Sequence, residues 1–318
     1  RMPPHIAAGW GGTPGGKNYH VTSGQNATFY VEELETGHVR KRVIDAGEDV
    51  ERGVRVMYFL EDAAVGDASL TIDEADGTEV ETFSSTIPPD KKDRQGLYIT
   101  ARAGMNSFLW PMTYPNGVKM IDTDFHKPPS GPLARPGTYT ATLKVGDWSM
   151  SQQFDLVKDP RVSVSDDDLA EQFKFQIQIR DKLSDIVTGV NTIRSLKRQL
   201  DDWTERLAGN ESAAGVMTSA RELRERLKAI EDELVQSEFT SDGDTLNYRV
   251  KLFEKLSDLV PVVGSADSRP TTQSYAVYEK LAGQADAQLS ALAAVIDGDL
   301  AQLNDEIAKL DVAVIGVP

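Results

Sequence analysis

The sequence has 318 residues, of which 50 are acidic and 34 are basic, giving a formal net charge of −16. This acidic balance argues against an extended nucleic-acid surface, because binding phosphates requires clustered Lys and Arg. The chain contains no cysteine, which excludes disulfides, thiol nucleophiles and thiolate metal sites. No apolar run reaches the ~18 residues expected of a membrane-spanning helix. A chain of this length is expected to form two domains.

Residues 1–45 are predicted to form an irregular arm followed by short strands. The first 18 residues are rich in Gly and Pro and show no sustained periodicity. Trp10 lies in this arm, where its ring would either serve as a ligand platform or pin the arm to a neighbouring domain. Strands are predicted for residues 27–34 and 38–44. Because the chain opens on Arg1 without a signal-peptide pattern, we expect it to come from a longer precursor.

Residues 46–160 carry closely spaced strand signals. Asp76-Gly77 predicts a two-residue hairpin turn, and Gly146-Asp147 predicts another. About seven short strands with turns every 8 to 12 residues predict an antiparallel β-sandwich of fibronectin type III or immunoglobulin-like kind. The strands are expected at residues 54–60, 68–74, 79–83, 97–101, 107–110, 138–145 and 148–157.

The hydrophobic period changes from two to about 3.6 after Asp159-Pro160 and does not change back. Ser165, with Asp168 three residues later, predicts a helix N-cap. Residues 161–318 are therefore expected to form an antiparallel four-helix bundle. Helices are predicted for residues 166–206, 212–236, 245–260 and 271–310, with a break at residues 261–270. Their apolar stripes are interpreted as core, and no inward carboxylate or histidine is expected on them.

Candidate chemistry is sparse, and the sequence predicts neither a catalytic residue nor a cofactor. A glycosidase needs two carboxylates across a cleft, and no motif separates such a pair from surface charge. Asp242 and Asp244 are weak metal candidates in a loop that fits no EF-hand. Trp110, Tyr114 and Trp148 are candidate binding residues, because flat rings stack on sugars. The alternative is that these rings lie in the core or at an interface.

Several segments, among them GPLARPGTYT, DPRV and AGMNSFLWPMTYP, resemble a known family. They are similar to the C-terminal region of exported microbial sortilin-like proteins with bacterial-neuraminidase-type repeats, often labelled glycosyl hydrolases. The similarity runs from about Val43 to Glu306. The resemblance implies a large β-propeller before this region, and export to the periplasm, cell surface or extracellular space.

We therefore expect a non-catalytic accessory module of an exported propeller protein. Its expected partners are the upstream propeller, in the same precursor or another chain, and a protein or glycan ligand, with no nucleic acid and no membrane span. One alternative is the C-terminal part of a glycosidase or peptidase whose active site lies mainly on the propeller. Another is a structural component of a cell-surface assembly.

Overall fold

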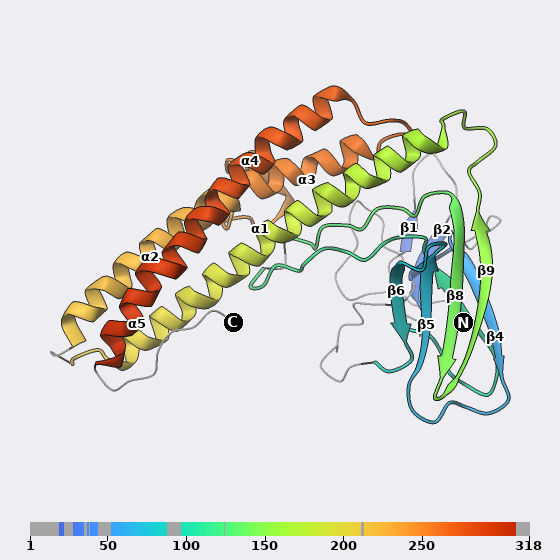
Figure 1. Cartoon of the computed structure of the whole chain (residues 1–318), viewed down its shortest axis with the longest axis horizontal. Coiled ribbons are helices and arrows are strands. Elements are labelled where there is room, and N and C mark those ends of the chain that lie inside the picture. The colour runs from blue at the N-terminus through green and yellow to red at the C-terminus, as the bar shows by residue number, and fades with distance from the viewer. Residues whose placement is uncertain are drawn as a thin grey trace. The chain divides into compact units, whose positions relative to one another are not determined.

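The computed structural model describes residues 19–21, 28–34, 37, 39–43, 52–87, 97–123, 125–210 and 213–309. The chain divides into two compact units. The first consists of Arg1–Tyr114 and Pro136–Lys158, and the second of Pro115–Arg135 and Asp159–Pro318. Antiparallel sheets form the first unit and helices dominate the second (Figure 1). The expected combination of β and α structure is confirmed at this level.

A three-stranded antiparallel sheet lies near the start of the chain. It consists of β1 (Tyr19–Val21), β2 (Thr28–Glu33) and β3 (Val39–Val43). The strands predicted for residues 27–34 and 38–44 are thus confirmed as the β2–β3 pair. In the turn between them Gly37 has φ 77°, and its N–H donates to the carbonyl oxygen of Leu34 at 2.9 Å. Glycine adopts this left-handed conformation without steric cost.

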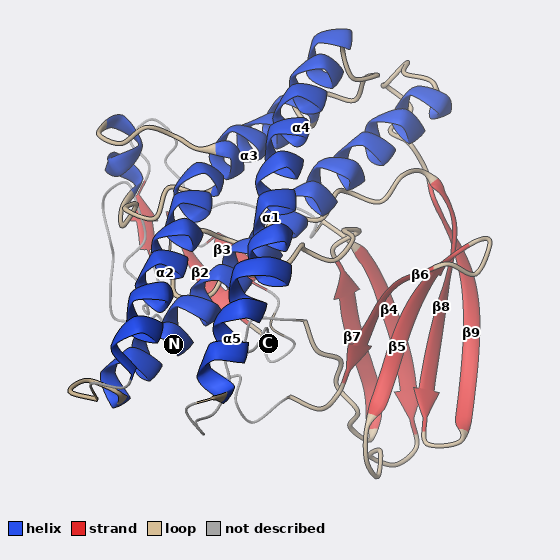
Figure 2. Cartoon of the chain, turned by 60° about the vertical axis from the view of Figure 1, so that its left-hand side comes forward, coloured by secondary structure: helices blue, strands red, loops and turns tan. Residues whose placement is uncertain are grey.

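Two further antiparallel sheets complete the first unit (Figure 2). One pairs β4 (Val54–Leu60) with β7 (Gly104–Trp110). The strands of the other are β5 (Ala68–Glu74), β6 (Glu79–Ser84), β8 (Gly137–Val145) and β9 (Trp148–Leu156). Their order in the sheet is β6-β5-β8-β9. The hairpin turns predicted at residues 76–77 and 146–147 join β5 to β6 and β8 to β9.

The strand predicted for residues 97–101 is wrong. Tyr98 and Ile99 are buried, at 6% and 3% exposure, but the segment pairs with no strand among the described residues. Its backbone is held by isolated hydrogen bonds: the Ile99 N–H donates to the Ser84 carbonyl oxygen at 3.1 Å, and the Ala101 carbonyl oxygen accepts from the Ala64 N–H at 3.0 Å. Asn106 Oδ1 then accepts from Thr100 Oγ1 at 2.8 Å and from the Arg102 N–H at 3.1 Å. Buried backbone groups of this segment are therefore paired without forming a regular ladder.

The two-stranded and four-stranded sheets of the first unit contact each other through aromatic rings. Phe83 on β6 and Phe108 on β7 have ring centroids 4.6 Å apart. Trp110 on β7 lies 5.5 Å from Tyr139 on β8 and 6.1 Å from Phe154 on β9. Such offset and edge-on contacts add to the free energy gained by removing the rings from water. The core of this unit therefore lies between the two-stranded and four-stranded sheets.

The second unit is built from helices that pack on one hydrophobic core. They are α1 (Asp166–Arg206), α2 (Ala214–Leu234), the 3-10 helix η2 (Asp242–Leu246), α3 (Leu252–Val263), α4 (Thr272–Val295), the π-helical segment η3 (Ile296–Leu300) and α5 (Ala301–Ala308). The predicted N-cap is confirmed, because Ser165 Oγ accepts from the Asp168 N–H at 3.1 Å. Gly189 on α1 permits close packing, since a Cβ there would lie 2.6 Å from Leu289 Cδ2 on α4.

The helix predicted for residues 245–260 is misplaced. Its expected first residues belong to η2 and the segment after it, and α3 begins only at Leu252. The break expected at residues 261–270 is present but starts later, because Pro261 lies inside α3 and the chain leaves the helix only after Val263, before α4 begins at Thr272. Proline at this position removes one helical hydrogen bond, and the helix ends two residues later at Val263. The helix then ends where the Gly264 N–H donates to the Val260 carbonyl oxygen at 2.9 Å.

Residues 115–135 change the expected division of the chain at Pro160. They connect β7 to β8 in sequence, yet they belong to the helical unit. Met120 in this segment is 1% exposed and lies in the hydrophobic core of the helices. We call residues 115–135 the insert, because they interrupt the β unit in sequence while packing with the helices.

Candidate interaction site

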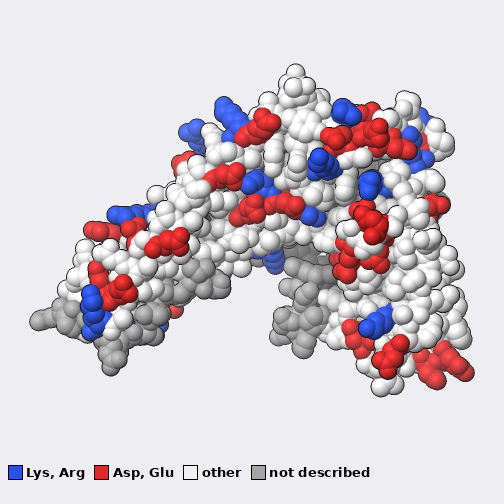
Figure 3. Space-filling view, viewed as in Figure 1, with Lys and Arg blue, Asp and Glu red and all other residues white. Residues whose placement is uncertain are grey.

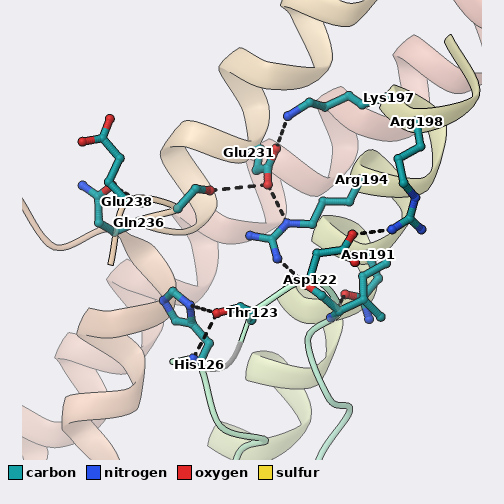
Figure 4. Close-up of polar contacts among 12 residues, drawn as sticks. Asp122, Thr123, His126, Asn191, Arg194, Lys197, Arg198, Glu231, Gln236 and Glu238 are labelled. Carbon is teal, nitrogen blue, oxygen red and sulfur yellow. Dashed lines mark hydrogen bonds and ion pairs between the residues drawn. The ribbon is translucent and has the colours of Figure 1, made fainter. Parts of the chain in front are cut away.

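The insert is fixed to α1 by side chains that replace a neighbouring strand. Asn191 Oδ1 accepts from the Ile121 N–H at 2.9 Å, and Asn191 Nδ2 donates to the Lys119 carbonyl oxygen at 3.0 Å. One amide group thus binds a backbone donor and a backbone acceptor of the insert (Figure 4). The insert needs such partners because its buried backbone groups lie outside regular secondary structure.

A second set of contacts on α1 holds the beginning of the insert. Ser184 Oγ accepts from the Val118 N–H at 3.2 Å, and an Arg180 guanidinium nitrogen donates to the Pro115 carbonyl oxygen at 3.2 Å. A Cβ at Gly117 would lie 2.3 Å from Ser184 Oγ. Glycine at this position therefore allows the backbone to approach α1 closely.

Glu231 on α2 is a buried carboxylate at the centre of this region. Its side chain is 4% exposed and forms ion pairs with Arg194 Nε at 2.7 Å and Lys197 Nζ at 2.8 Å (Figure 4). Burial raises the pKa of Glu231, but the hydrogen-bonded cations Lys197 and Arg194 outweigh this effect and hold its pKa below the usual range. Arg194 also donates to the Ile121 carbonyl oxygen. The ion-paired group therefore joins α1, α2 and the insert.

The insert reverses direction after Ile121. Asp122 has φ 56°, an uncommon backbone conformation for a residue other than glycine, and its carboxylate pairs with Arg198 on α1. Thr123 Oγ1 then accepts from the backbone N–H groups of Phe125 at 3.2 Å and His126 at 3.3 Å. This local turn directs the rings of Phe125 and His126 back toward the helices, as the ring contacts described next require.

His126 and Glu254 form a second buried polar contact, between the insert and α3. His126 Nε2 lies 2.9 Å from Glu254 Oε1, and the two side chains are 3% and 10% exposed. The carboxylate also accepts from the backbone N–H groups of Gln236 at 3.1 Å and Lys251 at 2.8 Å. Burial raises the pKa of Glu254, but these hydrogen bonds outweigh it and hold the pKa below its usual range.

Aromatic rings surround His126. Its ring is edge-on to Phe125 at 5.3 Å and to Phe253 at 5.6 Å, and it stacks on Phe239 at 6.2 Å. Phe239 also lies 5.4 Å from Phe125 and 6.4 Å from Tyr248. The rings come from the insert, from the connection between α2 and α3, and from α3 itself. They form a rigid apolar cluster joining segments far apart in sequence.

Two cavities open on either side of the Phe125–His126 segment. The first has a volume of about 750 Å³ and is lined by the insert, Arg194 and the residues that follow α2. The second has a volume of about 660 Å³ and lies between the insert and α3. Both are lined by Phe125, His126 and Phe239. We call these two cavities the insert groove. Their volumes are those of ligand sites in proteins, which are concave and largely preformed.

The predicted binding residues do not meet in one place. Trp110 is fully buried between the sheets, so the structure places its ring in the core. Tyr114 is partly buried, and its hydroxyl donates to Glu74; burial and this carboxylate raise the Tyr114 pKa well above its usual range. Trp148 is 51% exposed at the start of β9, whereas Phe154, which contacts Trp110, lies near the end of that strand.

The other candidates give no metal site in the described part of the chain. Trp10 lies outside the described residues, and so does the side chain of Asp242. The Asp244 carboxylate accepts from the backbone N–H groups of Thr240 at 2.7 Å and Ser241 at 2.9 Å, which lowers its pKa. Asp244 thus caps η2. Among the described residues no group of three or more His, Asp and Glu could hold a metal ion.

Sequence reasoning missed the charged groups that hold the insert against the helices. The expectation of no inward carboxylate on the helices is wrong, because Glu231 is 3% exposed. Glu231 follows the core residue Ile230 in sequence, so the pattern predicts a solvent-exposed charge beside the apolar stripe. The only signal was a distant one: Arg194 and Lys197 lie near the predicted inner face of their helix, where cations require a buried partner.

No protein-family model matches the chain, and a search of curated proteins finds no match either. None of the helices in the described ranges combines the length and apolar character needed to cross a bilayer. The geometry of the two units therefore carries the functional argument.

Proposed function

We propose that this chain is a non-catalytic interaction module whose insert groove binds a polypeptide segment of a partner protein. The observation that carries this proposal is the groove itself: two neighbouring cavities, of about 750 and 660 Å³, separated by an aromatic wall. Two neighbouring cavities of this size along a surface suit a bound segment, which places different side chains in each of them. Phe125, His126 and Phe239 supply the apolar surface that such side chains bury.

The charged groups around the groove have structural roles. Arg194 and Lys197 neutralise Glu231, while Glu254 accepts hydrogen bonds from His126 and two backbone amides. These contacts hold the insert against the helices before any ligand arrives. A preformed wall lowers the entropy cost of binding, which favours recognition by shape. Across the face of the helices in Figure 3, acidic and basic side chains alternate instead of forming a patch of one sign.

The resemblance to exported sortilin-like propeller proteins suggests where the partner lies. In this proposal the first unit is a fibronectin type III-like sandwich, the second is an antiparallel four-helix bundle, and both support an upstream β-propeller. The aromatic contacts between the two sheets support the first assignment, and the shared core of α1 to α5 supports the second. The partner segment then comes from the propeller or from a protein bound beside it.

The test is a titration of the full chain with the propeller segment of its precursor, followed by calorimetry. We expect binding that Phe125→Ala weakens about tenfold, because rigid rings in interface pockets carry a large share of binding energy. Phe59→Ala is the matched control, since Phe59 is 65% exposed and belongs to the first unit, whereas the residues that line the groove belong to the second. Circular dichroism would confirm that both variants are folded.

Each other outcome has a defined meaning. Binding lost with Trp10→Ala but unchanged in Phe125→Ala would place the interface on the arm and contradict the groove. The absence of any binding would also contradict the proposal. Turnover of aryl glycosides or peptides by the chain, abolished by one carboxylate-to-amide substitution, would favour the alternative in which the chain contributes residues to a hydrolase.

A further inference from the structure

β6 carries a carboxylate on the core face of the four-stranded sheet. Glu81 is the Cα partner of Ile72 on β5, and cross-strand partners share one face of a sheet. Ile72 is fully buried, and Phe83, two residues after Glu81 on the same strand, is 3% exposed. Glu81 is itself partly buried. The carboxylate therefore shares the face on which Phe83 contacts Phe108 of the facing sheet.

A bulge in β6 brings Glu81 to this face. Asp73 pairs with Glu79 and Ile72 pairs with Glu81, so Val80 is an extra residue in the strand. Val80 is buried on the core side, and strict alternation after it would place Glu81 on the solvent side. The register shift instead keeps both residues on the core face.

No cation in the elements around β6 compensates Glu81. The strands β5, β6 and β7 and residues 97–101, which contact β6 through hydrogen bonds or rings, contain no Lys or Arg. Within the described ranges the Glu81 carboxylate forms no hydrogen bond and no ion pair. Burial accordingly raises the pKa of Glu81 to about 7, and no described charge offsets it.

The other titratable groups of these elements are acids and phenols. They are Asp73 and Glu74 on β5, Glu79 on β6, Tyr98 in residues 97–101, Tyr58 on β4, and Asp67, which accepts from Ser84 at the end of β6. β7 has none. Burial and the facing Glu79 raise the pKa of Asp73. Like charges opposite each other are destabilising, so this pair opposes ionisation in the same direction as Glu81 does.

We propose that Glu81 makes the β5–β6 hairpin a pH-sensitive element of the first unit, which packs tightly while Glu81 holds a proton and loosens when the carboxylate ionises. A neutral carboxyl lies against apolar neighbours at small cost, whereas an unpaired carboxylate there loses its hydration. The proposal does not depend on the insert groove, because the groove belongs to the second unit.

The direction of the pH effect follows from the raised pKa. The folded chain keeps the proton on Glu81 up to about pH 7, whereas an unfolded chain releases it near about pH 4.3. The stabilisation is therefore complete below the unfolded value and is lost as the pH rises through the folded one. β6 is the terminal strand of its sheet, so its separation from β5 releases Glu81 to water without disturbing β8 or β9.

The first experiment is a carbon NMR titration of the full chain labelled at the glutamate carboxyl groups. We expect one glutamate carboxyl with a midpoint near pH 7, and its signal should be absent in Glu81→Gln. Glu61→Gln is the matched control, because Glu61 is exposed in the same unit. Its removal should leave the titration near pH 7 in place.

The second experiment measures amide hydrogen exchange of β6, corrected for the intrinsic pH dependence of exchange. In the wild-type chain the equilibrium constant for local opening of β6 should rise about tenfold or more from pH 5.5 to pH 8, because the opened state releases the proton at lower pH. Glu81→Gln should show a much smaller rise, and Glu61→Gln should behave like the wild-type chain.

Two results would overturn the proposal. One is a titration in which every glutamate carboxyl of the folded chain has its midpoint below pH 5.5, or in which the signal near pH 7 remains in Glu81→Gln. The other is an opening constant of β6 that depends on pH equally in the wild-type chain and in Glu81→Gln. Neither result bears on binding at the insert groove, so failure of this proposal is distinguishable from failure of the proposed function.

Discussion

The buried carboxylate of Glu231 gives the sharpest test of how the insert is held to the helices. Glu231→Gln keeps the shape of the side chain and removes its charge. The side chains of Arg194 and Lys197, which are 11% and 20% exposed, then lose the anion that compensates them. Removing one partner of a buried ion pair costs ~3–5 kcal/mol, because the remaining charge stays away from water.

We expect a loss of about 3 kcal/mol for Glu231→Gln, at the lower end of that range, because Lys197 retains some contact with solvent. Urea unfolding followed by circular dichroism at 222 nm reports on the helical unit. Glu225→Gln is the matched control on the same helix, where the carboxylate is 72% exposed, and should change stability by under ~0.5 kcal/mol.

A double-mutant cycle with Arg194→Met and Glu231→Met separates the pair from its surroundings. The double variant should be more stable than the sum of the two single losses, because it leaves neither charge of that pair buried alone. A loss below ~1 kcal/mol for Glu231→Gln, or strict additivity in the cycle, would refute this account of the ion pairs.

Three further predictions follow from named contacts. Gly53→Ala should destabilise the first unit by roughly 2–4 kcal/mol in thermal unfolding, because Gly53 has φ 144° and a Cβ would lie 2.4 Å from the Trp110 carbonyl oxygen. Asn191→Ala should increase amide hydrogen exchange across residues 115–135 while α1 stays protected, since both of its hydrogen bonds go to the insert. The pKa of Glu254 is lowered in the folded chain, so its stabilising contribution is complete above the unfolded carboxyl pKa and is lost as pH falls through the folded one. Below about pH 4, the free energy of unfolding should therefore fall less steeply with decreasing pH in Glu254→Gln than in the wild-type chain. An unchanged slope would contradict this assignment.

Local patterns in the sequence determined most of the secondary structure. Alternating apolar residues located β4, β5, β6 and the β8–β9 hairpin, and glycine with aspartate located their turns. The Ser165 N-cap and the 3.6-residue period located α1 over its full length. These features depend on neighbours within a few residues, and such neighbours are written directly in the chain.

Only the tertiary structure decided the fate of segments whose partners are distant. Residues 97–101 have the apolar pattern of a strand, but their backbone makes only isolated hydrogen bonds, such as those of Ile99 with Ser84 and of Ala101 with Ala64. The sequence predicts Trp110 and Trp148 equally as binding residues. Sheet packing buries Trp110 and leaves Trp148 exposed on the edge strand.

The insert shows the same limit most clearly. Nothing in residues 115–135 predicts that Met120 enters a core whose helices begin 46 positions later, at Asp166. Arg194, Glu231 and Glu254 were three charges on three separate segments until folding brought them against the insert. Burial and charge pairing depend on distances across the fold, and a periodicity along the chain contains no information about those distances.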